Sequence, residues 1–245
     1  MMELVAVTKL YQQGRRSVQA LRGVSLKIET GEFVAIMGPS GSGKSTMMHL
    51  LGALDTPTSG QALFLGKDLQ ALSDRERSLL RRTRMGFVFQ FFNLLPTLTA
   101  AENVALPLLL GGQPRARALL EAAAALDRVG LQRRADHHPE EMSGGEMQRV
   151  AIARALVTEP DAVLCDEPTG NLDSATSKEV LALLRSLPEP GRRSVVMVTH
   201  ESQAAAYGDR LVKIRDGLVE SDSGQTAATD GAGQRPRSAQ TGVIR

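Results

Sequence analysis

The chain has 245 residues, of which 42% are hydrophobic, and a formal net charge of +2. This length and apolar content suit one large domain with its own core, and so small a charge gives no argument for a nucleic-acid partner. No apolar run reaches the ~18 residues that cross a bilayer, and the first residues lack the basic-then-apolar layout of a signal peptide. The single cysteine, Cys165, excludes an internal disulfide and is expected to be a buried strand residue.

The first elements predicted along the chain are strands, followed by a phosphate-binding pattern. Residues 3–7 and 18–28 have strand character, with a polar turn at about 12–16, and 33–37 is a short apolar run typical of a buried strand. Directly after it comes the sequence Gly-Pro-Ser-Gly-Ser-Gly-Lys-Ser-Thr at 38–46, which fits G-x-x-x-x-G-K-[ST]. A helix is expected over 45–54, so the pattern has the strand-loop-helix context that a phosphate loop requires.

The chemistry of this loop follows from its residue types. The glycines at 38, 41 and 43 allow a tight turn, so that successive N–H groups and the N-terminus of the next helix converge on an anion. Lys44 can reach the β- and γ-phosphates, and the Ser45 hydroxyl can bind Mg²⁺. The residues predicted to bind the nucleotide here are Gly38, Pro39, Ser40, Gly41, Ser42, Gly43, Lys44, Ser45 and Thr46.

The middle of the chain is predicted to be mostly helical. A capping box at 73–76 opens an arginine-rich segment, which we interpret as a solvated helix face, and residues 85–89 form an apolar strand that ends at Gln90. From Thr99, which begins a second capping box with Glu102, the pattern is helical to about residue 158, with Pro114 at a helix start and Gly130 at a helix end. We expect an inserted helical subdomain over about 92–160.

The strand pattern resumes in the last third. Strands are expected at 162–165 and 195–198, separated by a helix over about 174–186, and alternation of this kind implies a parallel sheet with helices on its faces. Asp216-Gly217 predicts a hairpin turn between strands at 211–215 and 218–220. We expect the domain to end at 221 and residues 222–245, rich in Ser, Gly, Gln, Thr and Ala, to be disordered.

The acidic pair Asp166-Glu167 follows directly after the strand at 162–165. A carboxylate at that position beside a phosphate loop can hold Mg²⁺, and the next one can orient and deprotonate a water that attacks the γ-phosphate. The alternative is an acidic pair that merely opens the turn at Pro168. By itself the pair supports both interpretations equally, and the phosphate loop favours catalysis.

Residues 142–156, Met-Ser-Gly-Gly-Glu-Met-Gln-Arg-Val-Ala-Ile-Ala-Arg-Ala-Leu, make the chain resemble the ATP-binding-cassette (ABC) ATPases, whose signature is usually L-S-G-G-Q. Their other motifs appear in the same order, and the match covers about 2–220. Within the family, 87–96 and 166–173 are most similar to the ATPases of lipoprotein-releasing and macrolide-export permeases. The motif residues outside the two loops are Tyr11, Gln90, Asp166, Glu167, Asn171, Asp173 and His200.

The signature has a physical basis of its own. Ser143 can cap a helix whose first N–H groups, at Gly144 and Gly145, face an anion. Glu146 stands where the family usually has Gln, but Ser143-x-x-Glu146 still forms a capping box. The alternative, a helix cap without a ligand, is disfavoured by the phosphate loop upstream and the acidic pair downstream.

The resemblance implies an α/β fold: a P-loop NTPase sheet core, the inserted helical subdomain and an N-terminal antiparallel β part. Two copies would dimerise head to tail, with each ATP between one subunit's phosphate loop and the other's signature, Ser143, Gly144, Gly145 and Glu146. ATP and Mg²⁺ are the implied ligands, with Lys44 on the phosphates and Ser45 and Asp166 on the metal.

The remaining roles also come from the resemblance. Gln90 would sense the metal and the water, Glu167 would be the base, and His200 would contact the γ-phosphate. Asp173 would couple the two sites, and Tyr11 would stack on adenine. Taken singly, a histidine after an apolar strand is usually structural, Gln90 is also explained as the end of its strand, and Tyr11 as a packed strand residue.

A complete ATPase site without a membrane segment implies that the work is delivered to another protein. The resemblance implies a membrane permease, docked near Phe91, Phe92, Leu94 and Leu95, with this chain peripheral at the cytoplasmic face of the inner membrane. One alternative is a non-transport ABC ATPase that acts on a ribosome or a DNA-repair complex. A P-loop kinase is another, but it leaves the signature unexplained. The transported substrate is not indicated by the sequence.

Overall fold

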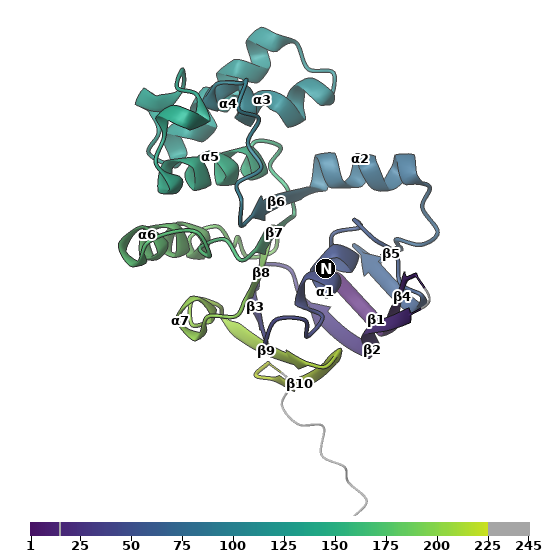
Figure 1. The fold of residues 1–245 in the computed structure, drawn as a ribbon. Helices are drawn as coiled ribbons and strands as arrows, with labels where there is room; N and C mark the ends of the chain where they lie inside the picture. Colours follow the sequence, from purple (N-terminus) through teal and green to yellow (C-terminus); the bar gives the residue numbers. More distant parts are fainter. Residues whose placement is uncertain (15, 225–245) are drawn as a thin grey trace, which may run out of the picture.

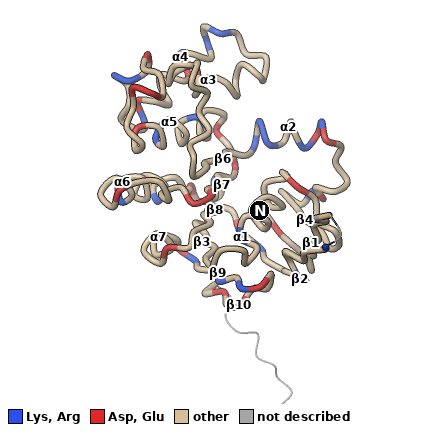
Figure 2. Tube along the Cα trace, viewed as in Figure 1, with Lys and Arg blue, Asp and Glu red and all other residues tan. Residues whose placement is uncertain are grey.

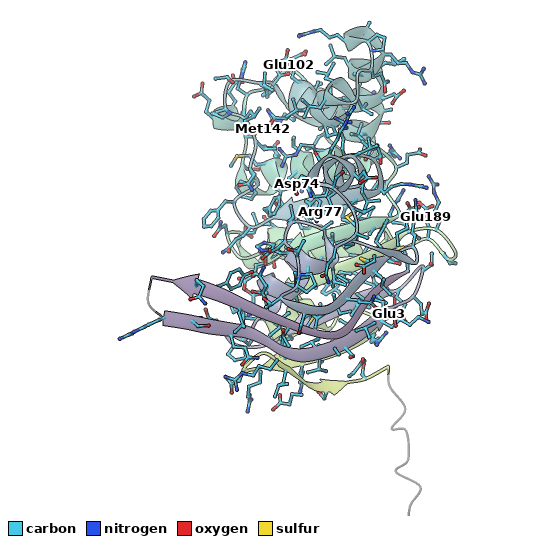
Figure 3. The ribbon with its side chains drawn as sticks, turned by 90° about the vertical axis from the view of Figure 1, so that its right-hand side faces the viewer. Glu3, Asp74, Arg77, Glu102, Met142 and Glu189 are labelled. Carbon is cyan, nitrogen blue, oxygen red and sulfur yellow. The ribbon has the colours of Figure 1, made fainter. Side chains whose placement is uncertain are left out.

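The computed structural model describes residues 1–14 and 16–224 (Figure 1). An antiparallel sheet opens the chain: β1 (Met2–Gln13) and β2 (Arg16–Ile28) pair as a long hairpin, and β4 (Ser59–Phe64) and β5 (Lys67–Asp68) extend it in the order β2-β1-β4-β5. Figure 3 shows this hairpin from the side. The N-terminal antiparallel part predicted from the family resemblance is therefore present, whereas β4 and β5 were not predicted individually.

A second sheet of six strands forms the centre, in the order β10-β9-β3-β8-β7-β6. Its members are β3 (Phe33–Met37), β6 (Met85–Phe89), β7 (Ala162–Asp166), β8 (Ser194–Thr199), β9 (Arg210–Arg215) and β10 (Leu218–Asp222). All neighbouring pairs are parallel except β9 and β10, the predicted hairpin, whose turn residues Asp216 and Gly217 both have positive φ.

The central strands are buried on both faces, which explains their continuous apolar runs. Alternate residues join different cores. Phe33 and Ala35 of β3 face one core, together with Cys165 of β7, while Val34 and Ile36 face the other. The predicted burial of Cys165 is confirmed, and burial raises the pKa of its thiol.

The helices are distributed over the two faces of this sheet. The second core includes α1 (Lys44–Leu51) and the antiparallel sheet, and the first includes α3 (Ala100–Leu110), α4 (Arg115–Arg128), α5 (Gly144–Leu156), α6 (Ser174–Arg185) and α7 (Ser202–Ala205). Figure 1 shows α3, α4 and α5 gathered above the sheet. They lie between β6 and β7 in sequence, with the short 3₁₀ helices η1 (Gln132–Arg134) and η2 (Pro139–Glu141) before α5.

One helix, α2 (Asp74–Arg84), projects beside β6 and has no buried residue. Figure 2 shows basic residues distributed along much of this helix. The predicted capping boxes at Ser73, Thr99 and Ser143 all form, because each needs only residues three apart.

Two expectations concern the chain as a whole. No helix within 1–14 and 16–224 has both the length and the apolar character that spanning a bilayer requires. Asp222, predicted to begin the tail, instead closes β10 and pairs with Arg210 at 2.6 Å. Residues 225–245 of the predicted tail lie outside the described residues.

Candidate active site

Four parallel strands bring the predicted site residues to one edge of the central sheet. In register, Met37 lies beside Thr199, Val198 beside Asp166, and Asp166 beside Phe89. The segments that follow these strand ends are the phosphate loop, His200, Glu167 and Gln90. The sheet order β3-β8-β7-β6 therefore gathers motifs that are spread over more than half of the sequence.

The phosphate loop, residues 38–46, lies close to a strand of each sheet. A Cβ at Gly38 would lie 2.1 Å from the carbonyl oxygen of Ile214, and one at Gly43 would lie 2.6 Å from that of Ala20. Gly43 also has φ of 103° and caps α1, so a side chain there is excluded by both space and backbone conformation. The glycines thus fix the loop against β9 and β2.

Lys44 begins α1 and is almost completely buried. Its Nζ donates a hydrogen bond of 2.8 Å to the carbonyl oxygen of Pro39 within the same loop. The ammonium group is thereby held over the loop whose N–H groups can bind an anion. Lys44 is therefore kept at the loop where the sequence predicts a phosphate.

Ser45 and Asp166 provide hard oxygen ligands from two elements. The Ser45 hydroxyl lies 3.4 Å from Asp166 Oδ1, at the end of β7. Burial raises the pKa of Asp166, an effect that His49 opposes and Glu167 reinforces. In the part of the chain that the structure describes, no three His, Cys, Asp or Glu side chains cluster as a metal site. The pair therefore fits an Mg²⁺ ion that also binds ligand phosphates and waters, as Mg²⁺ commonly does.

Glu167 and His200 lie close together, with 2.9 Å between Glu167 Oε2 and His200 Nδ1. Glu167 is one of the few non-glycine residues with positive φ, 45°, and its N–H donates to the Val198 carbonyl at 2.9 Å. Its own carbonyl accepts from Gly170 N–H at 3.0 Å. Backbone bonds on both sides thus hold the strained residue so that its carboxylate lies at the sheet edge.

Gln90 lies against the turn that follows Glu167. Its carbonyl accepts from Asn171 Nδ2 at 3.0 Å, and its Nε2 lies 3.3 Å from Asn171 Oδ1. A Cβ at Gly170 would be only 2.7 Å from Gln90 Nε2. Asn171 had been part of a motif but had no predicted role, and the structure identifies it as the partner that orients Gln90.

Tyr11, near the end of β1, lies beside α1. Its hydroxyl donates to Asp55 Oδ2 at 2.8 Å, and Lys9 Nζ lies 2.6 Å from Asp55 Oδ1 and 4.9 Å from the Tyr11 ring centroid. Burial and then Asp55 raise the pKa of Tyr11, and a hydrogen bond with Thr46 of the phosphate loop lowers it. The ring is therefore held next to the loop. Asp55 is far away in sequence, and no local pattern indicates it.

The signature segment, residues 143–146, begins α5. Ser143 Oγ accepts from Glu146 N–H at 3.3 Å, and Glu146 Oε2 accepts from Ser143 N–H at 2.8 Å. Among the described residues, no hydrogen bond or ion pair joins this segment to the phosphate loop of the same chain. The N-terminus of α5 is thus formed for an anion but is not bonded to the loop that would carry one.

Asp173 acts as the N-cap of α6. Its Oδ1 accepts from the N–H groups of Ala175 and Thr176, and its Oδ2 accepts from Thr176 Oγ1 at 2.6 Å. A Cβ at Gly145 would lie 2.2 Å from Thr176 Cγ2. Asp173 therefore holds the side chain that packs against the signature, and Gly145 has an intramolecular reason to lack a side chain in addition to the predicted access for an anion.

Gln148 links the middle of α5 to the same edge. It is fully buried, and its Nε2 donates to the Pro168 carbonyl at 2.6 Å and lies 3.4 Å from that of Phe89. The helix that begins with the signature thus contacts the backbone next to both Glu167 and Gln90.

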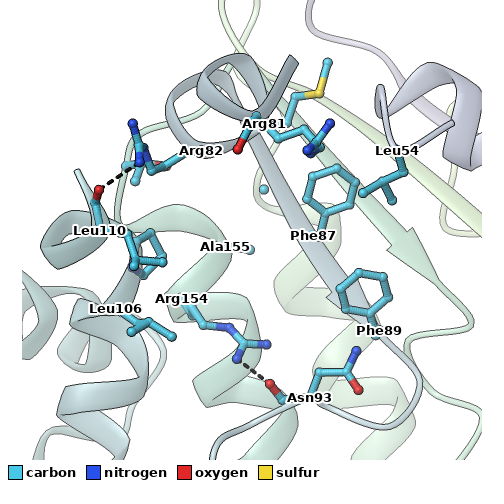
Figure 4. Close-up of a pocket in the computed structure, with 15 residues that line it drawn as sticks. Leu54, Arg81, Arg82, Phe87, Phe89, Asn93, Leu106, Leu110, Arg154 and Ala155 are labelled. Carbon is cyan, nitrogen blue, oxygen red and sulfur yellow. Dashed lines mark hydrogen bonds between the residues drawn. The ribbon is translucent and has the colours of Figure 1, made fainter. Parts of the chain in front are cut away.

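A groove of about 600 Å³ opens between α2, β6, α3 and α5 (Figure 4). Its walls combine the apolar residues Leu54, Phe87 and Leu110 with the guanidinium groups of Arg82 and Arg154. Arg82 donates to the Leu110 carbonyl at 2.8 Å and Arg154 to the Asn93 carbonyl at 2.5 Å. The groove is therefore lined by both apolar and cationic groups.

The four residues predicted to dock a permease divide into two pairs. Phe91 and Leu95 are exposed, at 72% and 44%. Leu94 packs on the core, and the Phe92 ring lies 3.8 Å from the position of a Cβ at Gly144. None of the four lines the groove, which the sequence did not indicate because its residues come from four elements.

Comparison with known proteins gives a consistent picture. The family model described as "ABC transporter" matches residues 21–170. The chain is 50% identical over 222 residues to a macrolide export ATP-binding/permease protein, MacB, of Chlorobaculum tepidum, covering 91% of this chain and 34% of the relative. It is also 50% identical to an uncharacterized ABC transporter ATP-binding protein of Thermotoga maritima, covering 89% of this chain and 93% of that protein. The chain thus spans about a third of the MacB relative and most of the Thermotoga one.

Solved structures resemble the fold over nearly the same range. The ATP-binding cassette MJ0796, in a dimeric post-hydrolysis state with ADP and Pi, has a TM-score of 0.83 and 45% identity. The superposition covers 91% of this chain and 97% of that one. A second dimeric structure of the same cassette matches with 46% identity.

Proposed function

The chain belongs to the ABC transporter family and is an ATP-binding and ATP-hydrolysing cassette, and we propose that it powers a membrane permease through ATP-dependent closure of a dimer. The family and the fold class predicted from the sequence are confirmed. The observation that supports the mechanism best is the gathering of the phosphate loop, Asp166, Glu167, His200 and Gln90 at one edge of the sheet.

In this proposal the phosphate loop holds the triphosphate and Lys44 exchanges its bond to the Pro39 carbonyl for the β- and γ-phosphates. Ser45 and Asp166 would hold Mg²⁺, which would neutralise phosphate charge, and Gln90, just after the strand β6 that pairs with the strand of Asp166, would sense it. Tyr11 stacks on the adenine. The hydrogen bonds to Asp55 and Thr46 fix the ring before the base arrives, which reduces the ordering cost of binding.

Hydrolysis in this scheme depends on Glu167 and His200. Glu167 accepts a proton from the attacking water, the water oxygen bonds to the γ-phosphorus, and the bond to the β-phosphate oxygen breaks. His200 contacts the γ-phosphate, and its ring nitrogen, 2.9 Å from the Glu167 carboxylate, helps to orient the base. The products are ADP and phosphate.

The second half of each site comes from a second copy of the chain. The signature segment makes no bond to its own phosphate loop among the described residues, and the related cassette MJ0796 has been solved as a dimer. We infer a head-to-tail pair in which Ser143 and the first N–H groups of α5 face the partner's ATP. Asp173, through Thr176 and Gly145, connects this contact to α6.

The groove between α2, β6, α3 and α5 is the surface that we assign to the permease, at the cytoplasmic face of the membrane. A segment with an apolar face and a carboxylate would match Leu54, Phe87 and Leu110 on one side and Arg82 and Arg154 on the other. Phe91 and Leu95, in the segment after β6, provide further exposed apolar area for such a partner. We therefore propose that the permease docks at this groove, near the residues predicted from the sequence.

The test combines two measurements on the purified chain. Mg²⁺-dependent ATP hydrolysis is expected, and the chain should co-purify from mild detergent with a membrane protein that stimulates it. Stimulation by ribosomes or DNA instead would support the alternative of a non-transport cassette. Absence of ATP hydrolysis with the membrane protein, with ribosomes and with DNA would contradict the catalytic assignment.

A further inference from the structure

The substitution of Glu for the usual Gln in the signature introduces a negative charge where the proposed dimer needs to attract ATP. Both oxygens of Glu146 are engaged. Oε2 accepts from the Ser143 N–H at 2.8 Å and lies 3.0 Å from its hydroxyl, while Oε1 accepts from Arg134 Nε at 2.8 Å. Bonds from the Ser143 backbone lower the pKa of Glu146 most, with Arg134 contributing, so the carboxylate is ionised at neutral pH.

Contacts other than the one with Glu146 also hold Arg134 and its neighbours in place. It ends η1, and the carbonyls of Ala135 and His137 accept from the N–H groups of Ala101 and Ala100, in the first turn of α3. The Nη1 atom of Arg134 lies 3.0 Å from His137 Nε2. The side chain of Arg134 is 42% exposed and that of Glu146 only 16%, so the pair is partly shielded from solvent. An ion pair of this kind has more influence than one at the open surface.

The capping box does not itself need the arginine. At the start of α2, Glu76 forms the same capping box with Ser73, whose N–H donates to Glu76 Oε2 at 2.8 Å. Within the described residues, no ion pair involves Glu76. The capping-box Glu102 of α3 does have an arginine partner, Arg115, so an arginine is optional for the cap itself and capping does not explain Arg134. What distinguishes α5 is its proposed ligand, because the attraction of a helix N-terminus for phosphate is opposed by a carboxylate in the first turn.

We propose that Arg134 is a positioning residue that neutralises Glu146 and holds it on Ser143, so that the signature can accept the partner subunit's ATP. This inference rests on the shared site of the proposed function. It predicts that Arg134 matters only as long as residue 146 is charged.

The experiment compares Arg134→Met, Arg134→Lys, Glu146→Gln and the double variant Arg134→Met/Glu146→Gln. Each is made in the Glu167→Gln background, and ATP-dependent dimerisation is measured by analytical ultracentrifugation. Arg134→Met should weaken dimerisation about tenfold or more, as expected for loss of a partly buried charge partner. Arg134→Lys should retain most of it, and the double variant should recover to the level of Glu146→Gln alone.

A matched control lies in the same helical block. Arg115 pairs with Glu102 at 2.6 Å, and Glu102 is the capping-box glutamate of Thr99, away from the signature. Arg115→Met removes an equivalent pair and should leave dimerisation unchanged. Melting temperatures of all variants establish that each is folded.

Three results would overturn the inference: dimerisation of Arg134→Met equal to its parent, no recovery in the double variant, or an Arg134→Lys variant as weak as Arg134→Met. The second and third would show that Arg134 acts through loop packing. Failure of the parent itself to dimerise with ATP would instead contradict the proposed function, so the two ideas can fail separately.

Discussion

Gly145 has two possible reasons to be glycine, and one pair of substitutions separates them. In Gly145→Ala the new Cβ lies 2.2 Å from Thr176 Cγ2, far inside normal contact, so one of the two groups must move. Overpacking of this kind costs about 1–3 kcal/mol, and the better helix propensity of alanine returns up to about 1 kcal/mol. The two effects together leave about 0–2 kcal/mol, and we expect the middle of this range, a net loss of about 1 kcal/mol, which lowers the melting temperature by about 2–4 °C in a chain of this size.

Adding Thr176→Ser removes the methyl group and keeps the hydroxyl that bonds Asp173. The double variant should therefore recover the melting temperature in calorimetry. Its ATPase activity should stay low if the extra Cβ also obstructs the partner's ATP, and Thr176→Ser alone serves as the control. A stable Gly145→Ala variant, or a double variant that remains destabilised, would refute the packing explanation.

Three further outcomes test the hydrolytic edge and the shared site. Glu167→Gln should still bind ATP in a filter or fluorescence assay but hydrolyse it about 10²-fold more slowly or worse. Asp166→Asn should lose Mg²⁺-dependent activity yet raise the melting temperature of the nucleotide-free protein at neutral pH, because burial disfavours the charged carboxylate and raises its pKa. The pH dependence follows from linkage. The free-energy penalty of burying the Asp166 carboxylate is fully present above its raised pKa and disappears as the pH falls below the usual Asp pKa of 3.8. The stability advantage of Asp166→Asn should therefore fade in acid. Mixing inactive Lys44→Ala with inactive Ser143→Arg should restore hydrolysis, because a mixed dimer has both defects in one site and an intact second site. With unbiased pairing, about a quarter of all sites are then intact.

Each of these has a result that would contradict it. Near-normal turnover of Glu167→Gln would remove that residue from the role of base. An Asp166→Asn variant that melts below wild type at pH 7 would show that the carboxylate stabilises the free protein. For the mixture, dimers confirmed by mass to be mixed but unable to bind ATP at either site would argue against sharing.

The parts of this structure that were predictable depend on short stretches of chain. The phosphate loop, the capping boxes and the 216–217 turn each need only a few neighbouring residues, and the buried strands appear as uninterrupted apolar runs. Strand β4 was missed because its first three residues are exposed and only Ala62 and Phe64 are buried, which leaves no clear alternation.

The residues that contact the site residues could not be predicted from the sequence, for a different reason. Asp55 meets Tyr11, and Arg134 meets Glu146, through folding that brings separate elements together, and no spacing rule connects them. Likewise, four apolar residues at 91–95 carry no periodicity that tells which side chains face outward.

The central sheet also constrains the order of folding. β6 ends at Phe89 and β7 begins at Ala162, yet the two pair side by side, so their pairing must close a long loop. Helices α3, α4 and α5 form from local contacts on much shorter timescales than such a closure. We expect the helical block to fold early and to shorten the distance that separates the two strands. Gln90 begins this gap and Glu167 follows β7, the strand after the gap, so the hydrolytic edge is completed only when the two strands pair.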